Sequence, residues 1–493
     1  LPKNSRLTDN VLIVVASNSL FEICTAFGVF SILGYMSHTA GTPMIQLITE
    51  GTGLIFIVFP MIFNIMGPIG RVLAPLLFLA ILFAGITSFL TMSYILAVNP
   101  GMFSVLDGMS TGAVFTATAL VAILGSLLIA FVAKMPFAIA PGMGSNAFFV
   151  FTVCIGMGYS WQFALTAVFL EGIIMLLLTI TRLRVIIVNA IPKSIKQSIS
   201  IGIGLFIAFI GFQNAGIVVN DESTLVRLGD ISSNNVLLAI IGIILTAVLT
   251  IRQVKGGLLI GILATTIIGI PMGITQFQGV VSAPQSIAPI FCQFEWGSIL
   301  TADMLVVVLS FLSIDLLALT GAAIGVSIKG GYADNDGNIP KINKVFLADS
   351  SATISSGIFG TSAACVFIES AAGVAQGGRS GLSAFTTAIC FAAALFFSPL
   401  FLAIPSAATA PVLIIVGLMM FGSVKELELE DYSEAIPAFV TIITMPLAYS
   451  IADGILWGVI SYVIINLLSG KFRKISLGMY ILAGLFVLKY IFI

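Results

Sequence analysis

The chain has 493 residues, of which 59% are hydrophobic and only 8% are charged, and its formal net charge is −1. This balance excludes a water-soluble globule, and with a single histidine it also excludes a basic surface for nucleic acid and a histidine-rich metal site. Apolar stretches of about 17–25 residues recur without the alternation of membrane β-strands, and they predict an all-α polytopic membrane protein.

Two apolar segments, near 10–36 and 45–65, are expected in an appended helical region over residues 1–71, with His38 in a loop between them. From residue 72 onward about fourteen transmembrane segments are predicted, several of them short or rich in glycine, as in helical transporters. We assign the first seven to residues 72–271, the second seven to 300–470, and residues 471–493 to a C-terminal apolar tail. The segments lie near 72–98, 111–133, 135–157, 161–181, 198–212, 235–251, 256–271, 300–328, 343–360, 363–375, 381–401, 407–421, 435–452 and 454–469.

Basic residues gather after every second segment of this series, whereas the opposite loops contain almost only Arg227. Because lysine and arginine favour cytoplasmic loops, every even-numbered segment is expected to end in the cytoplasm. The residues concerned are Lys134 after the second segment, Arg182, Arg184, Lys193 and Lys196 after the fourth, Arg252 and Lys255 after the sixth, Lys329, Lys341 and Lys344 after the eighth, Arg379 after the tenth, Lys425 after the twelfth, and Lys471, Arg473 and Lys474 after the fourteenth.

An internal repeat relates the two halves. The stretch "SFLTMSYILA" (88–97) resembles "SFLSIDLLAL" (310–319), which places Ser93 opposite Asp315, and the same offset carries Asn146 to a position beside Glu369. Because each half contains an odd number of segments, the second half enters the membrane from the opposite side. The sequence therefore predicts a seven-plus-seven inverted repeat.

Both halves interrupt their third segment with glycine and polar residues, in "IAPGMGSNAFF" (139–149), which also contains Pro141, and "GTSAACVFIESAAG" (360–373). Broken helical backbone inside a bilayer survives only where it lines a cavity or is buried in protein, and paired breaks are the best sequence pointer to a transport site. The structural alternative is that the small residues only permit close helix packing. That alternative leaves Asn146 and Glu369 without a purpose.

Carboxyl groups within apolar segments are costly and need a reason. Asp315 and Glu369 are the functional candidates, since a buried carboxyl is a plausible proton carrier at neutral pH. Alternatively, each of the two caps broken backbone or pairs with a basic side chain. Asp349 and Glu171 have no neighbouring break, and a structural role is favoured for both.

Two polar stretches are interpreted as loops. The stretch "DNDGN" (334–338) resembles the start of a calcium loop but has Val345 where the bidentate glutamate would stand, and "ELELED" (426–431) reads as a solvated acidic loop. No phosphate-binding loop or nucleophile system is recognisable, so neither an enzyme activity nor a cofactor is expected.

Four stretches carry a specific resemblance, which covers residues 84 to the end of the chain. "FLTMSYILAVNP" (89–100), "PFAIAPGMGSNAFF" (136–149), "NAIPKSIKQSISIGIGLFIAFIGFQNAG" (189–216) and "ESAAGVAQGGRSGL" (369–382) closely resemble the adenine/guanine/hypoxanthine permease branch of the nucleobase:cation symporter-2 family. The resemblance implies a proton-coupled purine importer of a bacterial inner membrane. It also implies core and gate domains interleaved across both repeats, elevator movement, a homodimer, and short extended strands where the third and tenth segments meet.

The resemblance also implies roles for single residues. Asn146 would contact the substrate, Glu369 would hydrogen-bond the purine edge, and Asp315 would be the eighth-segment carboxylate. Gly144 and Ser362 would complete the substrate site, and Asp315 and Glu369 would couple transport to protons.

The chain departs from this family's pattern in its eighth segment. The family usually reads D-L-F-D-T-x-G-T, whereas this chain reads "DLLALTGA" (315–322), with Ala318 at the second acidic position and Ala322 at the final threonine. The stretch before Glu369 is also more apolar than the usual threonine-rich pattern. A missing carboxylate alters base selectivity or proton stoichiometry, so the preferred purine stays open.

The first part of the chain resembles another family. "RLTDNVLIVVASNSLFEICTAFGVFSILGYM" (6–36), "GTGLIFIVFP" (51–60) and "LFLAILFAGITS" (77–88) resemble the seventh and eighth helices of the neurotransmitter:sodium symporter family, and the two resemblances overlap in "AGITSF" (84–89). That family's sodium ligands would map to Asn18, Thr87 and Ser88, with Glu22 near its chloride position.

The two resemblances predict opposite membrane orientations for the helix that they share. The eighth helix of the symporter family runs inward, whereas the first permease helix runs outward, and the downstream charge pattern favours the permease orientation. Two alternatives to purine transport remain: a non-transporting or misfolded fusion product, and a carrier of another nucleobase or an anion on the same fold. An anion carrier would favour a positive site, which the carboxylate of Glu369 argues against.

Overall fold

The computed structural model describes residues 68–181, 183–184, 191–277, 279–330, 332 and 341–492. The chain divides into two compact units, Leu1–Ile81 and Leu82–Ile493, and the boundary between them falls within helix α5 (Pro68–Met92). The predicted segments near 10–36 and 45–65, with Asn18, Glu22 and His38, lie outside the described residues, and so does the "DNDGN" stretch.

The described part of the chain contains eight helices that are long and apolar enough to cross a membrane, and three shorter apolar helices. The helical elements in chain order are α5 (Pro68–Met92), α6 (Ile95–Phe103), α7 (Thr111–Leu128), η2 (Ile129–Ala133), α8 (Met143–Ala147), η3 (Phe148–Gly156), α9 (Trp161–Ile180), α11 (Lys193–Asn214), α12 (Asn234–Ile251), α13 (Gly257–Gly269), η4 (Trp296–Ser298), α14 (Ala302–Gly330), α15 (Ile342–Phe359), α16 (Ser370–Ala375), α17 (Gly381–Ala394), η5 (Leu395–Phe397), α18 (Ser398–Leu402), α19 (Ser406–Phe421), η6 (Gly422–Glu426), α20 (Tyr432–Leu447), α21 (Ile451–Leu468), η7 (Phe472–Lys474) and α22 (Leu477–Phe492).

Two predicted boundaries are wrong. The first segment does not end at 98 but continues through α6 to Phe103, after a break at Ser93 and Tyr94. The thirteenth segment does not run to 452: α20 ends at Leu447 because Tyr449 adopts a φ of 53°, and Ser450 caps α21 by accepting a hydrogen bond from the Asp453 N–H. The count of fourteen membrane crossings stays a prediction.

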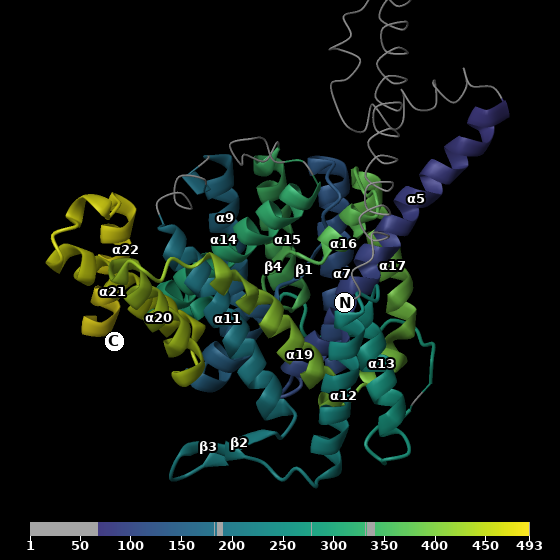
Figure 1. Ribbon diagram of the computed structural model, residues 1–493, viewed down its shortest axis with the longest axis horizontal. Helices are drawn as coiled ribbons and strands as arrows, with labels where there is room; N and C mark the ends of the chain where they lie inside the picture. Colours follow the sequence, from purple (N-terminus) through teal and green to yellow (C-terminus); the bar gives the residue numbers. More distant parts are fainter. Residues whose placement is uncertain are drawn as a thin grey trace, which may run out of the picture. The chain divides into compact units, whose positions relative to one another are not determined.

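Two short strands join the two halves of the chain. β1 (Ile139–Pro141) pairs antiparallel with β4 (Ala364–Val366), and Figure 1 shows the pair between the surrounding helices. The ladder extends at both ends, because the Gly142 N–H donates to Ala363 O and the Phe367 N–H donates to Ala138 O. These strands lie in the third and tenth predicted segments, so the backbone groups of the two broken helices satisfy one another.

A second strand pair forms a hairpin between α11 and α12. β2 (Val218–Asp221) and β3 (Leu225–Leu228) pair antiparallel and extend beyond the ends of the two helices (Figure 1). The hairpin carries Arg227, whose Nε atom lies 3.6 Å from the Oδ2 atom of Asp221. The hydrogen bonds that Ser223 and Thr224 donate to Asp221 lower the pKa of its carboxyl to about 2.

The helices of the second unit pack in two groups, each drawn from both halves of the sequence. In the first group α9 packs on α14 and α15, and α7 packs on α6, α15 and α17. In the second group α11 packs on α19, α20 and α21, and α12 packs on α13 and α19. The expected division into core and gate domains stays a prediction.

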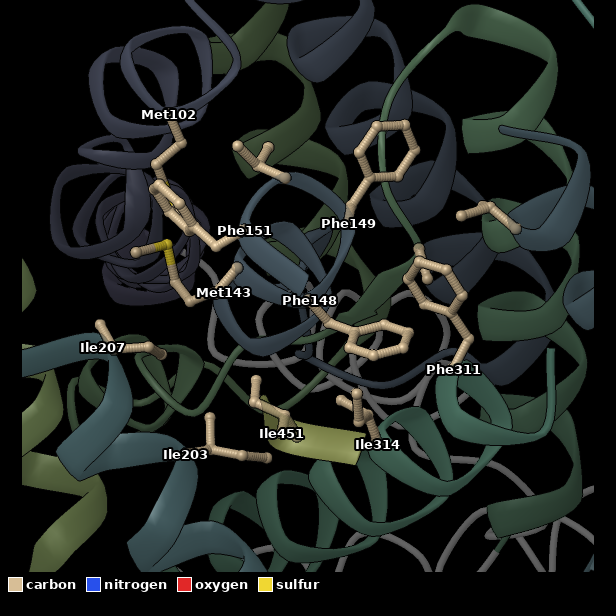
Figure 2. Packing of buried hydrophobic residues seen from close by; sticks show 14 of the residues in the cluster. Met102, Met143, Phe148, Phe149, Phe151, Ile203, Ile207, Phe311, Ile314 and Ile451 are labelled. Atoms are coloured by element: carbon tan, nitrogen blue, oxygen red, sulfur yellow. The ribbon is translucent and has the colours of Figure 1, made fainter. Parts of the chain in front are cut away.

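Apolar side chains fill the contact between the two groups (Figure 2). The rings of Phe148 and Phe311 meet edge to face at 4.7 Å, and Ile203 of α11 lies near them. A Cβ on Gly144 would lie 3.2 Å from the Ile203 side chain and 3.5 Å from that of Ile314. The broken third segment therefore lies directly against a helix of the second group.

The crossing of α11 and α19 depends on two facing glycines. A Cβ on Gly204 would lie 2.6 Å from Gly417 O, and one on Gly417 would lie 2.4 Å from Gly204 O. We expect Gly417→Ala to lower the free energy of unfolding by about 1–3 kcal/mol, because the backbones must separate. Thermal unfolding of the detergent-solubilised protein measures this, and Gly101→Ala, where a Cβ meets nothing within 4 Å, is the control. Equal melting temperatures for the two variants would contradict the prediction.

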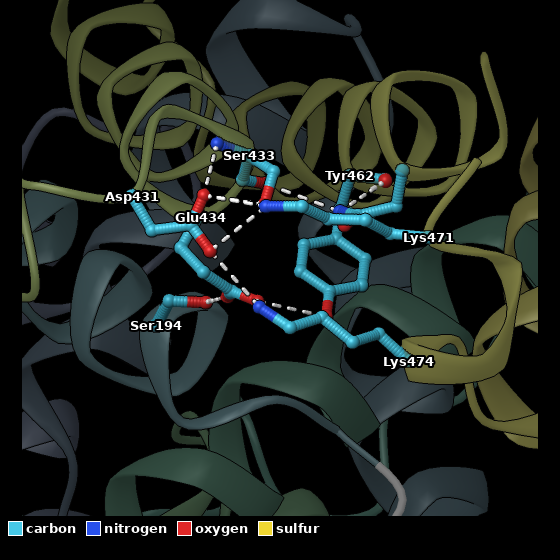
Figure 3. A network of polar contacts seen from close by, with 8 residues as sticks. Ser194, Asp431, Ser433, Glu434, Tyr462, Lys471 and Lys474 are labelled. Carbon is cyan, nitrogen blue, oxygen red and sulfur yellow. Dashed lines mark hydrogen bonds and ion pairs between the residues drawn. The ribbon is translucent and has the colours of Figure 1, made fainter. Parts of the chain in front are cut away.

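A polar network ties the start of α20 to the end of the chain (Figure 3). Asp431 accepts hydrogen bonds from Ser433 N and from the Nζ atoms of Lys471 (2.9 Å) and Lys474 (3.0 Å). Glu434 accepts from Lys474, from the Tyr462 hydroxyl and from the Ser194 hydroxyl. The last residue of "ELELED" is therefore held in an ion-pair network, not simply solvated as the sequence suggested.

This network predicts a pH-dependent stability. The hydrogen bond from Lys471, with those from Ser433 and Lys474, holds the pKa of Asp431 below its usual value. A lowered folded-state pKa stabilises the fold above the unfolded value of about 3.9, and this contribution declines as the pH falls toward the folded-state pKa. We expect Asp431→Asn to have a lower melting temperature than the parent protein at neutral pH. This difference between variant and parent should disappear as the pH is lowered. A difference that does not change with pH, or an equal effect of Glu428→Gln in the preceding loop, would contradict this.

Candidate functional site

Asn146 and Ser362 meet where the two broken helices approach. Asn146 lies on α8, just after β1, and Ser362 lies just before β4. The Ser362 hydroxyl donates a hydrogen bond to Asn146 Oδ1, and the Asn146 Nδ2 atom points at Met143 Sδ, 4.0 Å away. Both residues are buried. The structure thus joins two of the expected substrate-binding residues across the β1–β4 pair, and leaves the amide nitrogen with only a weak acceptor.

Glu369 forms a second polar pair. It precedes α16, and its Oε1 atom accepts a hydrogen bond of 2.8 Å from the hydroxyl of Tyr94, which lies at the break between α5 and α6. Its backbone carbonyl also accepts from Thr91 Oγ1. Glu369 is half-buried, beside the exposed Ile368. Its carboxylate therefore keeps acceptor capacity beyond the bond from Tyr94.

Asp315 belongs to a different set of side chains. Its Oδ2 atom lies 3.9 Å from Arg184 Nη2, which also lies 3.1 Å from Asp349 Oδ2. Among the described residues no donor makes a hydrogen bond to either Asp315 oxygen. The three expected residues Asn146, Asp315 and Glu369 are therefore found in three separate polar groups.

Cys365 of β4 lies between these groups. Its thiol is within electrostatic range of the carboxyls of Asp315, Asp349, Glu369 and Glu171. A Cβ on Gly142 would lie 2.7 Å from the Cys365 sulfur, so the thiol also lies against the turn that leads into α8.

Two residues of the site were not singled out by the sequence. Tyr94 stands in the repeat stretch that identified Ser93, but nothing local marks its hydroxyl as the partner of Glu369. Arg184 was expected among cytoplasmic loop charges, whereas the structure buries it completely. Counting basic residues along the sequence does not distinguish a guanidinium exposed in a loop from one that is buried against a helix bundle.

The two hydroxyls mapped onto a sodium site have other contacts. Thr87 donates to Gln376 Oε1 at 2.9 Å, and Ser88 donates to Ala84 O in its own helix. A Cβ on Gly373 would lie 2.1 Å from the Ser88 hydroxyl. Within the described ranges, no group of three or more His, Cys, Asp or Glu side chains is placed to hold a metal ion.

Two family models match the chain. The model of the Permease family matches residues 79–456. The model of the Sodium:neurotransmitter symporter family matches residues 2–154 and overlaps it.

Relatives match over most of their own length. A putative permease from Methanocaldococcus jannaschii is 44% identical over 83% of this chain and 94% of its own length. Adenine permease AdeQ of Escherichia coli K12 is 39% identical over 84% and 93%, and guanine/hypoxanthine permease PbuO of Bacillus subtilis is 43% identical over 82% and 95%. Among solved structures, the transmembrane domain of the cyanobacterial bicarbonate transporter BicA superposes with a TM-score of 0.56 at 17% identity, covering 77% of this chain and 97% of that domain. That likeness is one of fold.

Proposed function

Because this chain belongs to the Permease family, and is accordingly a multi-pass plasma-membrane protein, we propose that it imports purine nucleobases by proton symport. Adenine, guanine and hypoxanthine are the proposed substrates, since the relatives include permeases named for each of them. Uptake measurements decide which of the three bases is preferred.

The observation that carries the proposal is the meeting of two broken helices with polar side chains at their ends. The amide of Asn146, the hydroxyl of Ser362 and the carboxylate of Glu369 together present donors and acceptors. A purine has donors and acceptors along one edge and apolar faces, which suits a few fixed polar groups among aromatic and aliphatic side chains. The rings of Phe148 and Phe311 supply an apolar neighbourhood close to α8.

The proposed movement is of the elevator type. The group of helices that bears β1, β4 and α14 would slide against the group formed by α11, α19 and α20. The contact between them at Gly144 and Ile203 is apolar, so it offers no directional bonds that would resist sliding. We propose Asp315 and Glu369 as the carboxyls that link this movement to protons, and a homodimer as the assembled form.

Uptake by intact cells tests the function. Cells lacking their own nucleobase permeases would express the chain and be supplied with labelled adenine, guanine, hypoxanthine or uracil, with and without an uncoupler. We expect saturable uptake of at least one purine that collapses with the uncoupler, and no uptake of uracil. No purine uptake by a well-expressed, membrane-inserted protein would favour the non-transporting fusion. Purine uptake that is insensitive to the uncoupler would exclude proton coupling but not purine transport.

A further inference from the structure

Four buried charged side chains lie within electrostatic range of one another, apart from the Asn146–Ser362 and Glu369–Tyr94 pairs. Three of them come from three different helices and the fourth from the helical residues 183–184 that follow α9, and all four residues are 0% exposed. We call them the Arg184 cluster: Glu171 of α9, Arg184, Asp315 of α14 and Asp349 of α15.

The guanidinium of Arg184 lies closer to one carboxylate of the cluster than to another, and it also donates to two groups outside the cluster. Its Nη2 atom donates to Asp349 Oδ2 at 3.1 Å, and its Nη1 atom donates to Phe346 O at 3.4 Å and Ser350 Oγ at 3.3 Å. The guanidinium carbon lies 4.3 Å from the centre of the Phe346 ring. Asp315 has only the longer ion-pair contact of 3.9 Å. Asp349 is therefore paired through one short contact, at Oδ2, and Asp315 is paired only weakly.

Glu171 has no such support. Within the described residues neither of its carboxyl oxygens has a hydrogen-bond partner, although the residue is fully buried. The charged groups that act on it are Asp315, Asp349 and Arg184, from the helices packed against α9. Other titratable residues on the elements packed there are Asp303 and Lys329 of α14, Lys344 of α15 and Cys154 of η3, with Cys365 beyond them in β4.

The charge balance of the cluster indicates bound protons. Three carboxylates and one guanidinium would carry a net charge of −2 in a place without water contact, and an uncompensated buried charge is strongly disfavoured. Neutrality requires protons on two of the three carboxyls. Asp349 keeps its charge because it holds the short contact to Arg184, so the protons belong on Asp315 and Glu171. If Arg184 served only to hold α15 in place through an ion pair, the single carboxylate of Asp349 would be sufficient.

We propose that the Arg184 cluster is the proton-binding site of this transporter, and that one of the two protons held by Glu171 and Asp315 moves with the substrate. The inference rests on the proposed proton symport and differs from the proposal above in one residue, because Glu171 takes the place of Glu369 as the second proton-carrying carboxyl beside Asp315. The step adds one proton to a carboxylate oxygen from the water on one side and releases it to the water on the other, with no other bond changed. α14 carries Asp315 and also packs against β4 and α16, next to Ser362 and Glu369, so one helix connects the two sites. Glu171, which the sequence favoured as structural, thereby receives a role in coupling.

The test separates proton coupling from substrate movement. The purified full-length chain would be reconstituted in liposomes with labelled adenine, guanine or hypoxanthine outside. For one-to-one coupling, a gradient of one pH unit sustains an accumulation of up to about tenfold in the parent protein. We expect Glu171→Gln to reduce that ratio to about one, while exchange of labelled for unlabelled base, which needs no net proton movement, persists. The glutamine variant should fold, since it removes a carboxyl that has no partner.

Each outcome has a distinct meaning. Accumulation by Glu171→Gln equal to that of the parent overturns the inference and leaves the proposed function standing. A parent that exchanges base but never accumulates it overturns both proton symport and this inference, and a parent that does neither overturns the proposed function. Thr179→Val, a buried hydroxyl on the same helix that bonds only to Met175 O, should behave as the parent does. If Glu171→Gln fails to insert, Glu171→Asp serves instead: a pH profile of accumulation identical to the parent's overturns the inference.

Discussion

Replacing Glu369 by glutamine is expected to reduce purine uptake by about 10- to 100-fold, since a hydrogen bond to a charged group contributes about 1.5–3 kcal/mol. The change keeps the size of the side chain but turns an acceptor-only group into one that also donates. It would meet Tyr94, whose hydroxyl now donates to Oε1 at 2.8 Å, and a purine N–H that needs an acceptor. Initial rates of labelled purine uptake at several concentrations would measure the loss.

The control for this prediction is a carboxyl of the same kind outside the site. Glu430→Gln changes an exposed side chain in the loop before α20 and should leave uptake as in the parent. Tyr94→Phe removes only the hydroxyl that orients Glu369, and we expect a smaller loss than for Glu369→Gln. Uptake by Glu369→Gln within twofold of the parent, at equal amounts of protein in the membrane, would remove Glu369 from the substrate site.

Removing the guanidinium of Arg184 is expected to destabilise the protein by about 3–5 kcal/mol, because it leaves the buried carboxylate of Asp349 without its counter-charge. Arg184→Met keeps an apolar chain over the ring of Phe346 but loses the contacts to Asp349 and Asp315. The fraction of monodisperse protein that survives heating in detergent would measure the loss. This effect concerns folding, in contrast to the effect of Glu369→Gln on transport.

A second substitution shows whether charge is the cause. Adding Asp349→Asn to Arg184→Met removes the carboxylate that had the shortest contact, so the double variant should be more stable than Arg184→Met alone. Arg252→Met, an exposed basic residue after α12, is the matched control and should melt as the parent does. A double variant less stable than either single variant would show that packing, not charge, accounts for the loss.

The broken helices could be predicted from the sequence because their signal is local. Glycine, proline and polar residues within a few positions of Asn146 and Glu369 cannot continue an apolar helix, and their recurrence at one offset pointed to paired breaks. The break at Tyr449 was predicted a few residues too late, at 453, because the stretch before it is mostly apolar. No glycine marks the position, although Tyr449 adopts a φ of 53°.

The grouping of the buried charges could not be predicted in the same way. Asp315 and Arg184 are far apart in the sequence and come together only when α9, α14 and α15 pack. A rule that counts basic residues in loops places Arg184 in the cytoplasm. Glu171 then has no identifiable charged neighbour, and the sequence does not indicate whether its carboxyl is charged or neutral. Only the three-dimensional arrangement shows three acids around one base.

The pairing of β1 with β4 also constrains how the protein is made. The residues that complete the hydrogen bonds of Ile139–Pro141 lie more than two hundred positions further along the chain. At a synthesis rate of about 5–20 residues per second, the first strand waits at least about ten seconds for its partner to leave the ribosome. During that time its open peptide groups must be sheltered by the insertion machinery or by water. The β1–β4 pair can therefore form only after β4 has been synthesised, so the first half of the polypeptide cannot complete these backbone hydrogen bonds alone.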